Sequence, residues 1–420
     1  MTDTDDIDKV LSAARPQVVS ALLRYFRDLD MAEEAFQEAC LRAIKSWPRN
    51  GPPRDPKAWL IFVGRNVAID QLRKSVRLRP MPAEELVSDL DDAEASVAQR
   101  LDNADYRDDV LRLLFICCHP DVPATQQIAI ALRIVSGLSV KQIARAFLVS
   151  ESAMEQRITR AKAKISKANV PFEAPGPVER SERLAAVAAM IYLIFNEGYS
   201  SSGGAPLRAQ LCDEAIRLGR LLLRLFPAEP EIMGLLALML VQHSRAVARF
   251  DDQGNVILLE QQDRSLWNQQ MISEGLALID KAMRHNRAGP YLVQAAIGAL
   301  HARAHKPQDT DWQEIDLLYA MLERMQPSPV VTLNRAVAVS KAKGTEAALA
   351  MIEPLSESLS GYFHFFGLKG NLLMQLGRDR EARDAFNRAI AIANTPAEAA
   401  HIRMHLDRLS NEGAAASLPI

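Results

Sequence analysis

Two serines, Ser139 and Ser150, stand at the start of two short amphipathic stretches. Serine is a preferred N-cap residue, because its hydroxyl accepts a hydrogen bond from a backbone N–H in the first helical turn. In each stretch apolar residues recur at helical spacing, and the apolar residues 147–149 lie between the two. This pattern predicts a helix-turn-helix over residues 138–164.

The second stretch carries a basic face. Ala153, Arg157, Arg160 and Lys164 follow one another at helical spacing, and residues 131–170 hold eight Lys and Arg against two Glu. In a helix-turn-helix the second helix enters the major groove of DNA, and basic side chains further along neutralise phosphates. An ordinary helical hairpin with a solvated basic face would show the same local pattern.

Composition limits the class of protein. Gly and Pro are modest in number while Ala, Leu, Arg and Glu dominate, which favours an all-α chain, and 420 residues suggest two to four domains. Four cysteines make no disulfide framework and fit a reducing compartment. The acidic start MTDTDDIDKV is no signal peptide, and no apolar run reaches the ~18 residues of a spanning helix. We therefore expect a cytoplasmic protein without a membrane segment.

Residues 5–45 are predicted to form two or three helices with an acidic surface. Asp30 can cap a helix whose inward stripe is Ala32, Ala35/Phe36, Ala39 and Ala43. Five acids and no base lie in residues 28–38. They form either a solvated face or a docking surface for a basic partner.

A loop is predicted to begin at Trp47-Pro48, and a basic helix at Pro56. Residues 54–80 hold seven Lys and Arg against two Asp. A basic helix beside a loop with an aromatic at its edge suits single-stranded DNA, whose phosphates follow the groove while the loop holds an unstacked base. The alternative is that Trp47 and Trp59 pair in the core; we expect Trp59 in the core and leave Trp47 open.

Residues 81–109 hold ten acids against two arginines, which predicts a mostly flexible acidic linker before helix resumes at Tyr106. The following Cys117-Cys118-His119 has the wrong spacing for a zinc knuckle and no second Cys/His pair nearby. We therefore expect these residues to pack in the core, and we expect no metal.

The part of the chain after the short Pro-rich linker 171–177 is predicted to form helical hairpins. The last two hairpins repeat with a period of 34, which is the tetratricopeptide period: Ala336 and Gly370, Ala348 and Ala382, Ile352 and Phe386, Leu355 and Ala389 correspond. A stack of such hairpins offers a concave binding surface. A compact helical domain without regular repeats is the alternative.

Two segments interrupt these helices. Residues 196–204 form a Gly/Ser-rich stretch that no strand precedes, so a connecting or docking loop is favoured over a phosphate cradle. Residues 251–255 predict a turn, and residues 256–259 a short strand. The following Glu260, Asp263, Arg264 and Trp267 form either a buried polar cluster or half of an acid/base site, but no nucleophile-elbow, Walker or zinc-hydrolase motif supports an enzyme.

Residues 11–168 resemble a bacterial RNA polymerase sigma factor of the extracytoplasmic-function (ECF) type. The resemblance lies in AEEAFQEACLRA, in WLIFVGRNVAIDQLR and in the helix-turn-helix that ends in EQRITRAKAKI. Trp59, Arg65, Asn66, Asp70 and Arg73 fall at the family's spacing, whereas Cys40 stands where such factors usually carry Phe. FNEGYSSSGG and RFDDQGNVILLEQQDRSLW resemble the C-terminal extension of a sigma subgroup with tetratricopeptide-like repeats.

The resemblance implies an order of domains: a region 2 domain (1–80), the acidic linker (81–105), a region 4 domain (106–170) and a C-terminal helical regulatory domain (178–415). It implies core RNA polymerase and promoter DNA as partners, no cofactor, no catalysis, and a regulatory protein or peptide on the C-terminal domain. A one-component helix-turn-helix regulator with a helical-repeat sensor is the alternative. It would leave residues 28–77 without a role.

The implied contact residues form three sets. Core polymerase would bind Asp30, Glu33, Glu34, Gln37 and Glu38. The −10 element would bind Trp47, Arg54, Lys57, Arg65, Asn66, Arg73, Lys74 and Arg77. The −35 element would bind Ser150, Ser152, Ala153, Glu155, Gln156, Arg157, Arg160 and Lys164.

Overall fold

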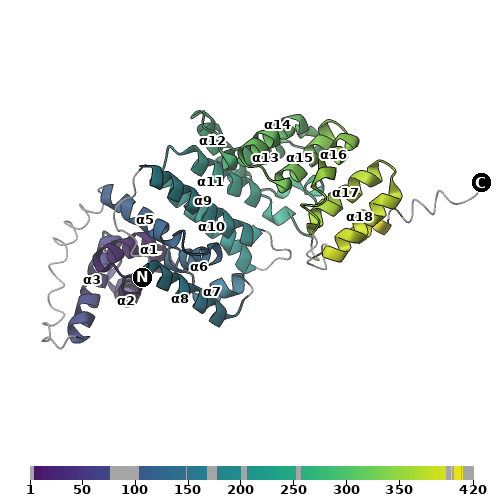
Figure 1. Ribbon diagram of the computed structural model, residues 1–420. Coiled ribbons are helices and arrows are strands. Elements are labelled where there is room, and N and C mark those ends of the chain that lie inside the picture. Colours follow the sequence, from purple (N-terminus) through teal and green to yellow (C-terminus); the bar gives the residue numbers. More distant parts are fainter. Residues whose placement is uncertain are drawn as a thin grey trace, which may run out of the picture. The chain divides into compact units, whose positions relative to one another are not determined.

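The computed structural model describes residues 4–75, 104–147, 149–167, 177–199, 206–251, 257–393, 399, 402–407 and 409. Within these ranges the chain is almost wholly helical and holds no β-strand, which confirms the predicted all-α class (Figure 1). None of the helices in the described ranges is long and apolar enough to cross a membrane.

The chain folds into two compact units. The first unit holds the chain as far as Gly198, near the end of α9 (Pro177–Tyr199), and Leu207–Ala215 of α10 (Pro206–Leu225). The second holds Tyr199, Pro206 and the chain from Ile216 onward. The predicted boundary at residue 178 does not coincide with this division, because α9 belongs to the first unit almost to its end.

The first unit begins with three helices, α1 (Thr4–Phe26), α2 (Leu29–Asn50) and α3 (Pro56–Ser75), each packed on the other two. The predicted inward stripe of α2 is confirmed, since Ala32, Ala35, Phe36, Ala39 and Ala43 are all buried. The helix axes of α2 and α3 come close at Gly64, where an added Cβ would lie 3.0 Å from the carbonyl oxygen of Ala35. A side chain there would push the two helices apart.

The end of α2 differs from the prediction. The helix does not give way to a loop at Trp47-Pro48 but continues to Asn50, where the N–H of Gly51 (φ 77°) bonds the carbonyl of Trp47. Proline so near a helix end costs little more than one backbone hydrogen bond. The N-cap is Asp28 rather than Asp30, because the Asp28 carboxylate accepts the N–H of Met31 at 2.8 Å.

The remaining helices of the first unit form the helix-turn-helix and its supports. They are α5 (Ala104–Cys117), α6 (Ala124–Ile134), α7 (Val140–Ala146), α8 (Glu151–Lys167), α9 (Pro177–Tyr199) and the first part of α10 (Pro206–Leu225). Cys117 and Cys118 are buried, which confirms the core-packing prediction, and the thiol of Cys118 lies 3.4 Å from the sulfur of Met190 on α9. Burial raises the pKa of Cys117 to about 12.

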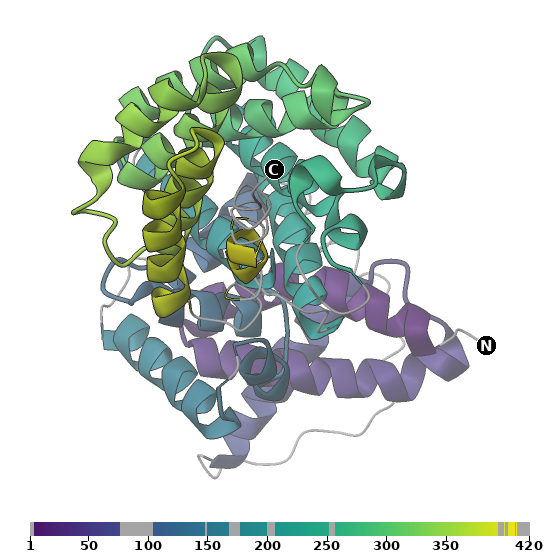
Figure 2. The ribbon, with the colours of Figure 1, turned by 90° about the vertical axis from the view of Figure 1, so that its right-hand side faces the viewer.

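The second unit is a succession of helices that follow one another around an arc (Figure 2). They are the rest of α10, α11 (Pro230–His243), α12 (Gln269–Met283), α13 (Pro290–Arg303), α14 (Trp312–Met325), α15 (Pro329–Ala342), α16 (Thr345–Ile352), α17 (Phe363–Gln375) and α18 (Asp379–Ile392). Short 3-10 helices lie at Ala246–Ala248, Leu259–Gln261, Arg264–Leu266, Pro307–Asp309 and Glu353–Leu355. The predicted strand at 256–259 is wrong as far as its described residues go, since residues 257 and 258 are irregular and Leu259 starts a 3-10 helix.

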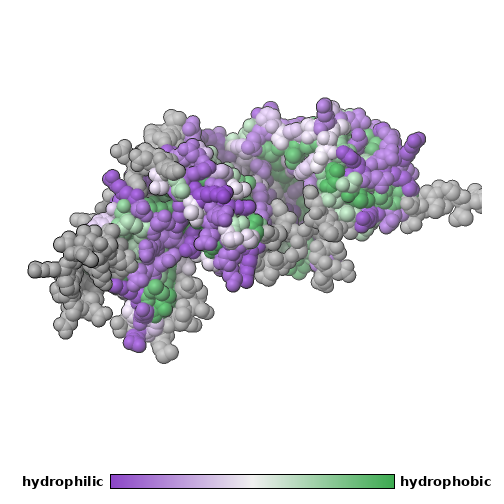
Figure 3. All heavy atoms as spheres, turned by 60° about the horizontal axis from the view of Figure 1, so that its bottom comes forward, coloured by the Kyte–Doolittle hydropathy of each residue, from purple (hydrophilic) through white to green (hydrophobic). Residues whose placement is uncertain are grey.

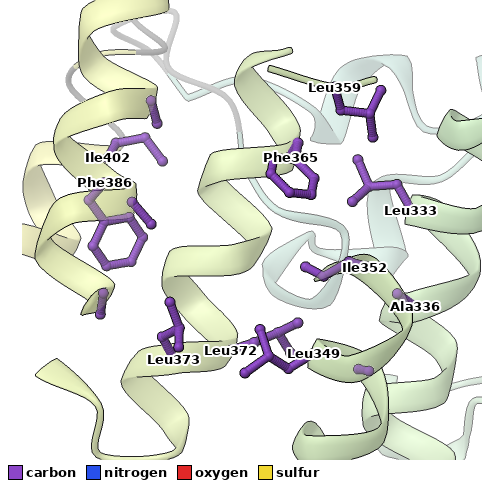
Figure 4. Close-up of a cluster of buried hydrophobic side chains, with 14 of the residues drawn as sticks. Leu333, Ala336, Leu349, Ile352, Leu359, Phe365, Leu372, Leu373, Phe386 and Ile402 are labelled. Carbon is purple, nitrogen blue, oxygen red and sulfur yellow. The ribbon is translucent and has the colours of Figure 1, made fainter. Parts of the chain in front are cut away.

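The last two hairpins, α15–α16 and α17–α18, share one core. In it α17 lies between Phe386 and Ile402 on one side and Ala336, Leu349 and Ile352 on the other (Figure 4). The positions predicted to correspond with a period of 34 belong to this core: Ala336, Gly370, Ala348, Ala382, Ile352, Phe386 and Ala389 are buried and Leu355 packs against them.

Candidate nucleic-acid and polymerase interface

The predicted helix-turn-helix is formed by α7 and α8, and both predicted caps are confirmed. The Ser139 hydroxyl accepts the N–H of Gln142 at 3.2 Å, and the Gln142 side chain accepts the N–H of Ser139 at 2.8 Å, which makes a capping box. At the start of α8 the Ser150 hydroxyl accepts the N–H of Ala153 at 3.2 Å. Each helix of the motif therefore begins at the serine that the sequence indicates.

Helix α8 has two distinct faces. Met154, Ile158, Ala161 and Ile165 are buried at helical spacing. Of the residues predicted for the −35 element, Ala153 and Arg157 are half-buried and the others are exposed: Ser150, Ser152, Glu155, Gln156, Arg160 and Lys164. The structure thus brings the predicted set together on the side of α8 that its own domain leaves open.

The acidic residues of α2 do not form a single exposed face. Asp30, Glu34 and Gln37 are exposed and Glu38 is half-buried, but Glu33 is only 5% exposed. Its carboxylate contacts cations of α1, α6 and α8, among them Lys162 at 3.1 Å. Hydrophobic periodicity could not find this, because all three cations lie on other helices and two of them, Arg133 and Lys162, are 100 or more residues away in the sequence.

The two tryptophans pair with each other, which is the alternative that the sequence left open. Trp47 is buried, at 2% exposure, and Trp59 is half-buried, with the ring centroids 5.4 Å apart in an edge-on arrangement. The prediction that Trp47 stands at the edge of a DNA-holding loop is therefore wrong. It failed because α2 continues past Pro48 and carries Trp47 into the core.

The other residues predicted for the −10 element lie at the start of α3 and along it. Arg54, Lys57, Arg65 and Asn66 are exposed, and the Arg65 guanidinium lies 4.4 Å from the ring centroid of Tyr25. The Asp55 carboxylate accepts the N–H groups of Lys57 and Ala58 and so caps α3. The side chains of Arg73 and Lys74 and the whole of Arg77 lie outside the described residues.

The described part of the first interrupting segment is fastened to residues that shortly precede the second. Residues 196–199 complete α9 rather than opening a loop, and the hydroxyl of Tyr199 accepts a hydrogen bond from Arg245 at 2.8 Å. The guanidinium of Arg249 lies 3.6 Å from the Tyr199 ring centroid and donates to the Tyr199 carbonyl at 2.7 Å. Residues 200–205 and 252–256 lie outside the described ranges.

The predicted polar cluster at Glu260, Asp263, Arg264 and Trp267 is only half formed. Arg264 donates to the carbonyls of His301 and Ala304, and its guanidinium lies 4.9 Å from the ring centroid of Trp267. By contrast Glu260 pairs with Lys341 at 3.0 Å, and Asp263 is exposed and caps a 3-10 helix. In the described parts of the chain, no three His, Cys, Asp or Glu residues gather as metal ligands would.

A groove of about 450 Å³ lies in the second unit beside Arg264. Four residues of α15 and four of α17 line the groove, and each residue of α15 has a counterpart on α17 that is 34 residues further along the chain. The pairs are Asn334 and Leu368, Val337 and Asn371, Ala338 and Leu372, and Lys341 and Gln375. Trp312 and Tyr319 of α14 add aromatic rings, and the Thr310 hydroxyl at its wall is buried with no hydrogen-bond partner among the described residues. Figure 3 shows apolar residues reaching the surface of this unit.

Three segments of the chain match known protein families. Residues 11–78 match Sigma-70 region 2, residues 112–165 match Sigma-70 region 4, and residues 183–283 match a family of unknown function, DUF6596. The chain thus combines the two sigma domains, α1–α3 and α5–α8, with a DUF6596 domain that runs from α9 to α12. No enzyme family is indicated.

Similarity over nearly the whole chain shows the family to which the protein belongs. An uncharacterized protein of Rhizobium meliloti (strain 1021) is 70% identical over 415 residues, 99% of this chain and 98% of the relative, and this chain belongs to the same family. The probable ECF RNA polymerase sigma factor SigI of Mycobacterium tuberculosis is 26% identical over 172 residues, 40% of this chain and 58% of SigI. These similarities support a sigma-factor role; the tetratricopeptide-like character of the second unit stays a prediction.

Proposed function

We propose that this chain is an RNA polymerase sigma factor of the ECF type, which binds core polymerase and directs it to promoters in the cytoplasm. The observation that carries the proposal is the pairing of a region 2 match with a region 4 match, in which α8 buries its apolar face and leaves a polar, basic face exposed. A one-component regulator would use the helix-turn-helix alone and would leave the region 2 domain without a role.

On this proposal α8 binds the −35 element. Arg160 is exposed and Arg157 half-buried on its open side, where they can contact bases or phosphates. Losing a base contact costs about 1–3 kcal/mol and relaxes specificity at one position, whereas losing a phosphate contact weakens binding to all sequences. The test is run-off transcription with purified core polymerase, comparing the Arg157→Ala, Arg160→Ala double variant with Arg380→Ala, an exposed arginine of α18.

Transcription that depends on both this chain and core polymerase supports the proposal. Unchanged promoter use by the double variant across a salt series would contradict the placement of α8. Promoter binding by the chain alone, without any stimulation of core polymerase, would favour the one-component regulator instead.

The exposed acids of α2 are proposed to bind core polymerase, and α3 with Arg54, Lys57 and Arg65 to bind the −10 element. Because Trp47 is buried, the half-buried Trp59 and the exposed Tyr25, which lies against Arg65, are the aromatic residues that we propose for this site. Reversing the charges of Glu34 and Glu38 should weaken core binding. A folded Glu34→Lys, Glu38→Lys variant that keeps its full affinity for core polymerase would remove this assignment.

We further propose that the second unit is a tetratricopeptide-like stack that modulates the sigma domains, and that its groove holds an extended peptide of a regulatory protein. Side-chain amides at one-repeat spacing can bond peptide groups, and the apolar and aromatic walls can take side chains. The Asn334→Ala, Asn371→Ala double variant should change promoter output in cells but not transcription by purified core polymerase and sigma factor. Unchanged output in cells would contradict the proposal.

A further inference from the structure

Glu33 joins the two sigma domains. Its carboxylate lies 2.9 Å from Nε of Arg133 at the end of α6, 3.3 Å from Nη2 of Arg15 on α1, and 3.1 Å from Nζ of Lys162 on α8. Lys162 also contacts the carboxylate of Asp30. We call these five residues the interdomain clasp. Two acids and one cation come from the region 2 domain, and two cations come from the region 4 domain.

Arg15 anchors the clasp on the region 4 side. Its Nε donates to the carbonyl of Ile134 at 2.9 Å, and its Nη2 donates to the carbonyl of Arg133 at 3.2 Å. The chain makes room for it at Gly137, where φ is 77° and an added Cβ would lie 2.8 Å from Cδ of Arg15. Arg15 thus fills a site shaped by the end of α6, and α1 also packs on α5. The contact between Arg15 and the end of α6 therefore consists of directed hydrogen bonds in a site of matching shape.

Four of the five charges in the clasp are largely enclosed, whereas the side chain of Asp30 is 72% exposed. Arg15 is 7% exposed, Glu33 is 5% exposed, and the side chain of Lys162 is 20% exposed. Burial lowers the pKa of Lys162, but its hydrogen bonds to Asp30 and Glu33 outweigh burial, so its pKa lies above the ordinary value. Glu33 is the enclosed acid that all three cations share, so removing Arg133 or Lys162 takes one of the contacts by which region 4 holds the region 2 domain.

The clasp occupies part of the surface that the proposed function gives to core polymerase. Asp30 is one of the exposed acids of α2, and its carboxylate pairs with Lys162 of region 4 although 72% of its side chain is exposed. Glu33, on the same helix, is enclosed by cations of its own chain and cannot at the same time meet those of a partner. We propose that region 4 is an intramolecular competitor of core polymerase for the acidic face of α2, so that the polymerase binds only after the clasp opens. This inference rests on the proposed binding of core polymerase by α2.

Competition makes a specific prediction about residues on the region 4 side. The apparent dissociation constant is the intrinsic one divided by the open fraction, so a chain that is open one-tenth of the time gains up to about tenfold in affinity when the clasp is broken. Lys162→Gln removes a clasp cation and leaves both carboxylates of α2 in place. It should therefore tighten the binding of core polymerase, by several-fold up to that limit.

The experiment uses the full chain and two readouts. Hydrogen exchange in the peptides of α1 and of residues 133–138 reports whether the clasp has opened, and fluorescence anisotropy gives the affinity for purified core polymerase. Lys141→Gln, an exposed lysine of α7 outside the clasp, is the matched control and should change neither readout. Arg133→Gln is the second clasp variant, and it should act in the same direction as Lys162→Gln.

Faster exchange together with tighter core binding in both clasp variants supports the inference. Faster exchange with unchanged or weaker core binding overturns it, because the clasp would then open without relieving any competition. Unchanged exchange in both variants also overturns it, because the clasp would then not hold the domains together. Failure of the unaltered chain and all variants to bind core polymerase would instead refute the proposed function.

Discussion

The core shared by the last two hairpins offers a sharp test of packing. Gly370 on α17 faces Phe386 on α18, and an added Cβ would lie 2.5 Å from two ring atoms, closer than the 3.0 Å limit that real Cβ atoms keep. One repeat earlier, Ala336 and Ile352 hold the corresponding positions, and both are fully buried. The last hairpin thus pairs the smaller Gly370 with the larger Phe386. The hairpin before it has the larger Ala336 and the smaller Ile352 at the same two positions.

Gly370→Ala should destabilise the second unit. Overpacking a well-filled core costs about 1–3 kcal/mol, while alanine gains about 1 kcal/mol over glycine in a helix, which leaves a net loss of up to about 2 kcal/mol. Gly367→Ala in the same helix is the matched control. Its Cβ would make an ordinary 3.4 Å contact with Ile402, so it should stabilise α17 by about 0.5–1 kcal/mol.

The combination with Phe386→Ile tests the reason for the loss. Phe386→Ile by itself should lower the stability of the second unit by about 1–2 kcal/mol, through lost burial and a cavity. In the Gly370→Ala background the new methyl group takes part of that space, so the double variant should be more stable than the sum of the single effects by about 1–2 kcal/mol. Hydrogen exchange in the α17 peptide of the full chain measures each loss, and additive effects would refute the reasoning.

Three further predictions concern single groups. Ser139→Ala should cost about 1 kcal/mol by removing the capping box of α7, measured as faster exchange in residues 140–146. Burial, and then two neighbouring arginines, lower the pKa of His301 from 6.5 to about 4, so the unfolded chain binds the proton first. Stability should therefore fall between about pH 6.5 and pH 4, by about 3 kcal/mol at most, and urea midpoints for His301→Gln should lack this step. The buried Cys117 should resist iodoacetamide at pH 8 in the native protein, whereas the half-buried Cys40 is labelled, as peptide mass mapping would show.

Sequence patterns predicted the parts of this fold that depend on local spacing. The inward stripe of α2, the caps at Ser139 and Ser150, and the open face of α8 follow from where apolar residues and serines recur along one helix. The predictions failed where a neighbouring helix decides. Trp47 is buried because α2 continues past a proline, and a local rule about Pro-rich segments does not include the gain from burying the indole.

The clasp shows the same limit at the candidate site. Glu33 belongs to a run of acids that local charge counting treats as one exposed face, yet its partners Arg133 and Lys162 are 100 and 129 residues further along the chain. Lys162 itself lies on α8 among residues predicted to face DNA, and it turns toward α2 instead. Only the pairing of distant helices separates the acids that are exposed from the one that is enclosed.

The packing of α9 decides how regulation by the C-terminal half can be tested. Truncation after residue 170 would remove Met190, whose sulfur contacts the buried thiol of Cys118, and Arg183, whose guanidinium lies 5.9 Å from the ring centroid of Phe115. Cys118 and Phe115 belong to the region that supports the helix-turn-helix, so the shortened chain would expose part of that core. Lost transcription by such a chain would therefore report damage to region 4 as readily as lost regulation. Point variants in the groove leave α9 in place, and for this reason they can separate a regulatory second unit from a structural one.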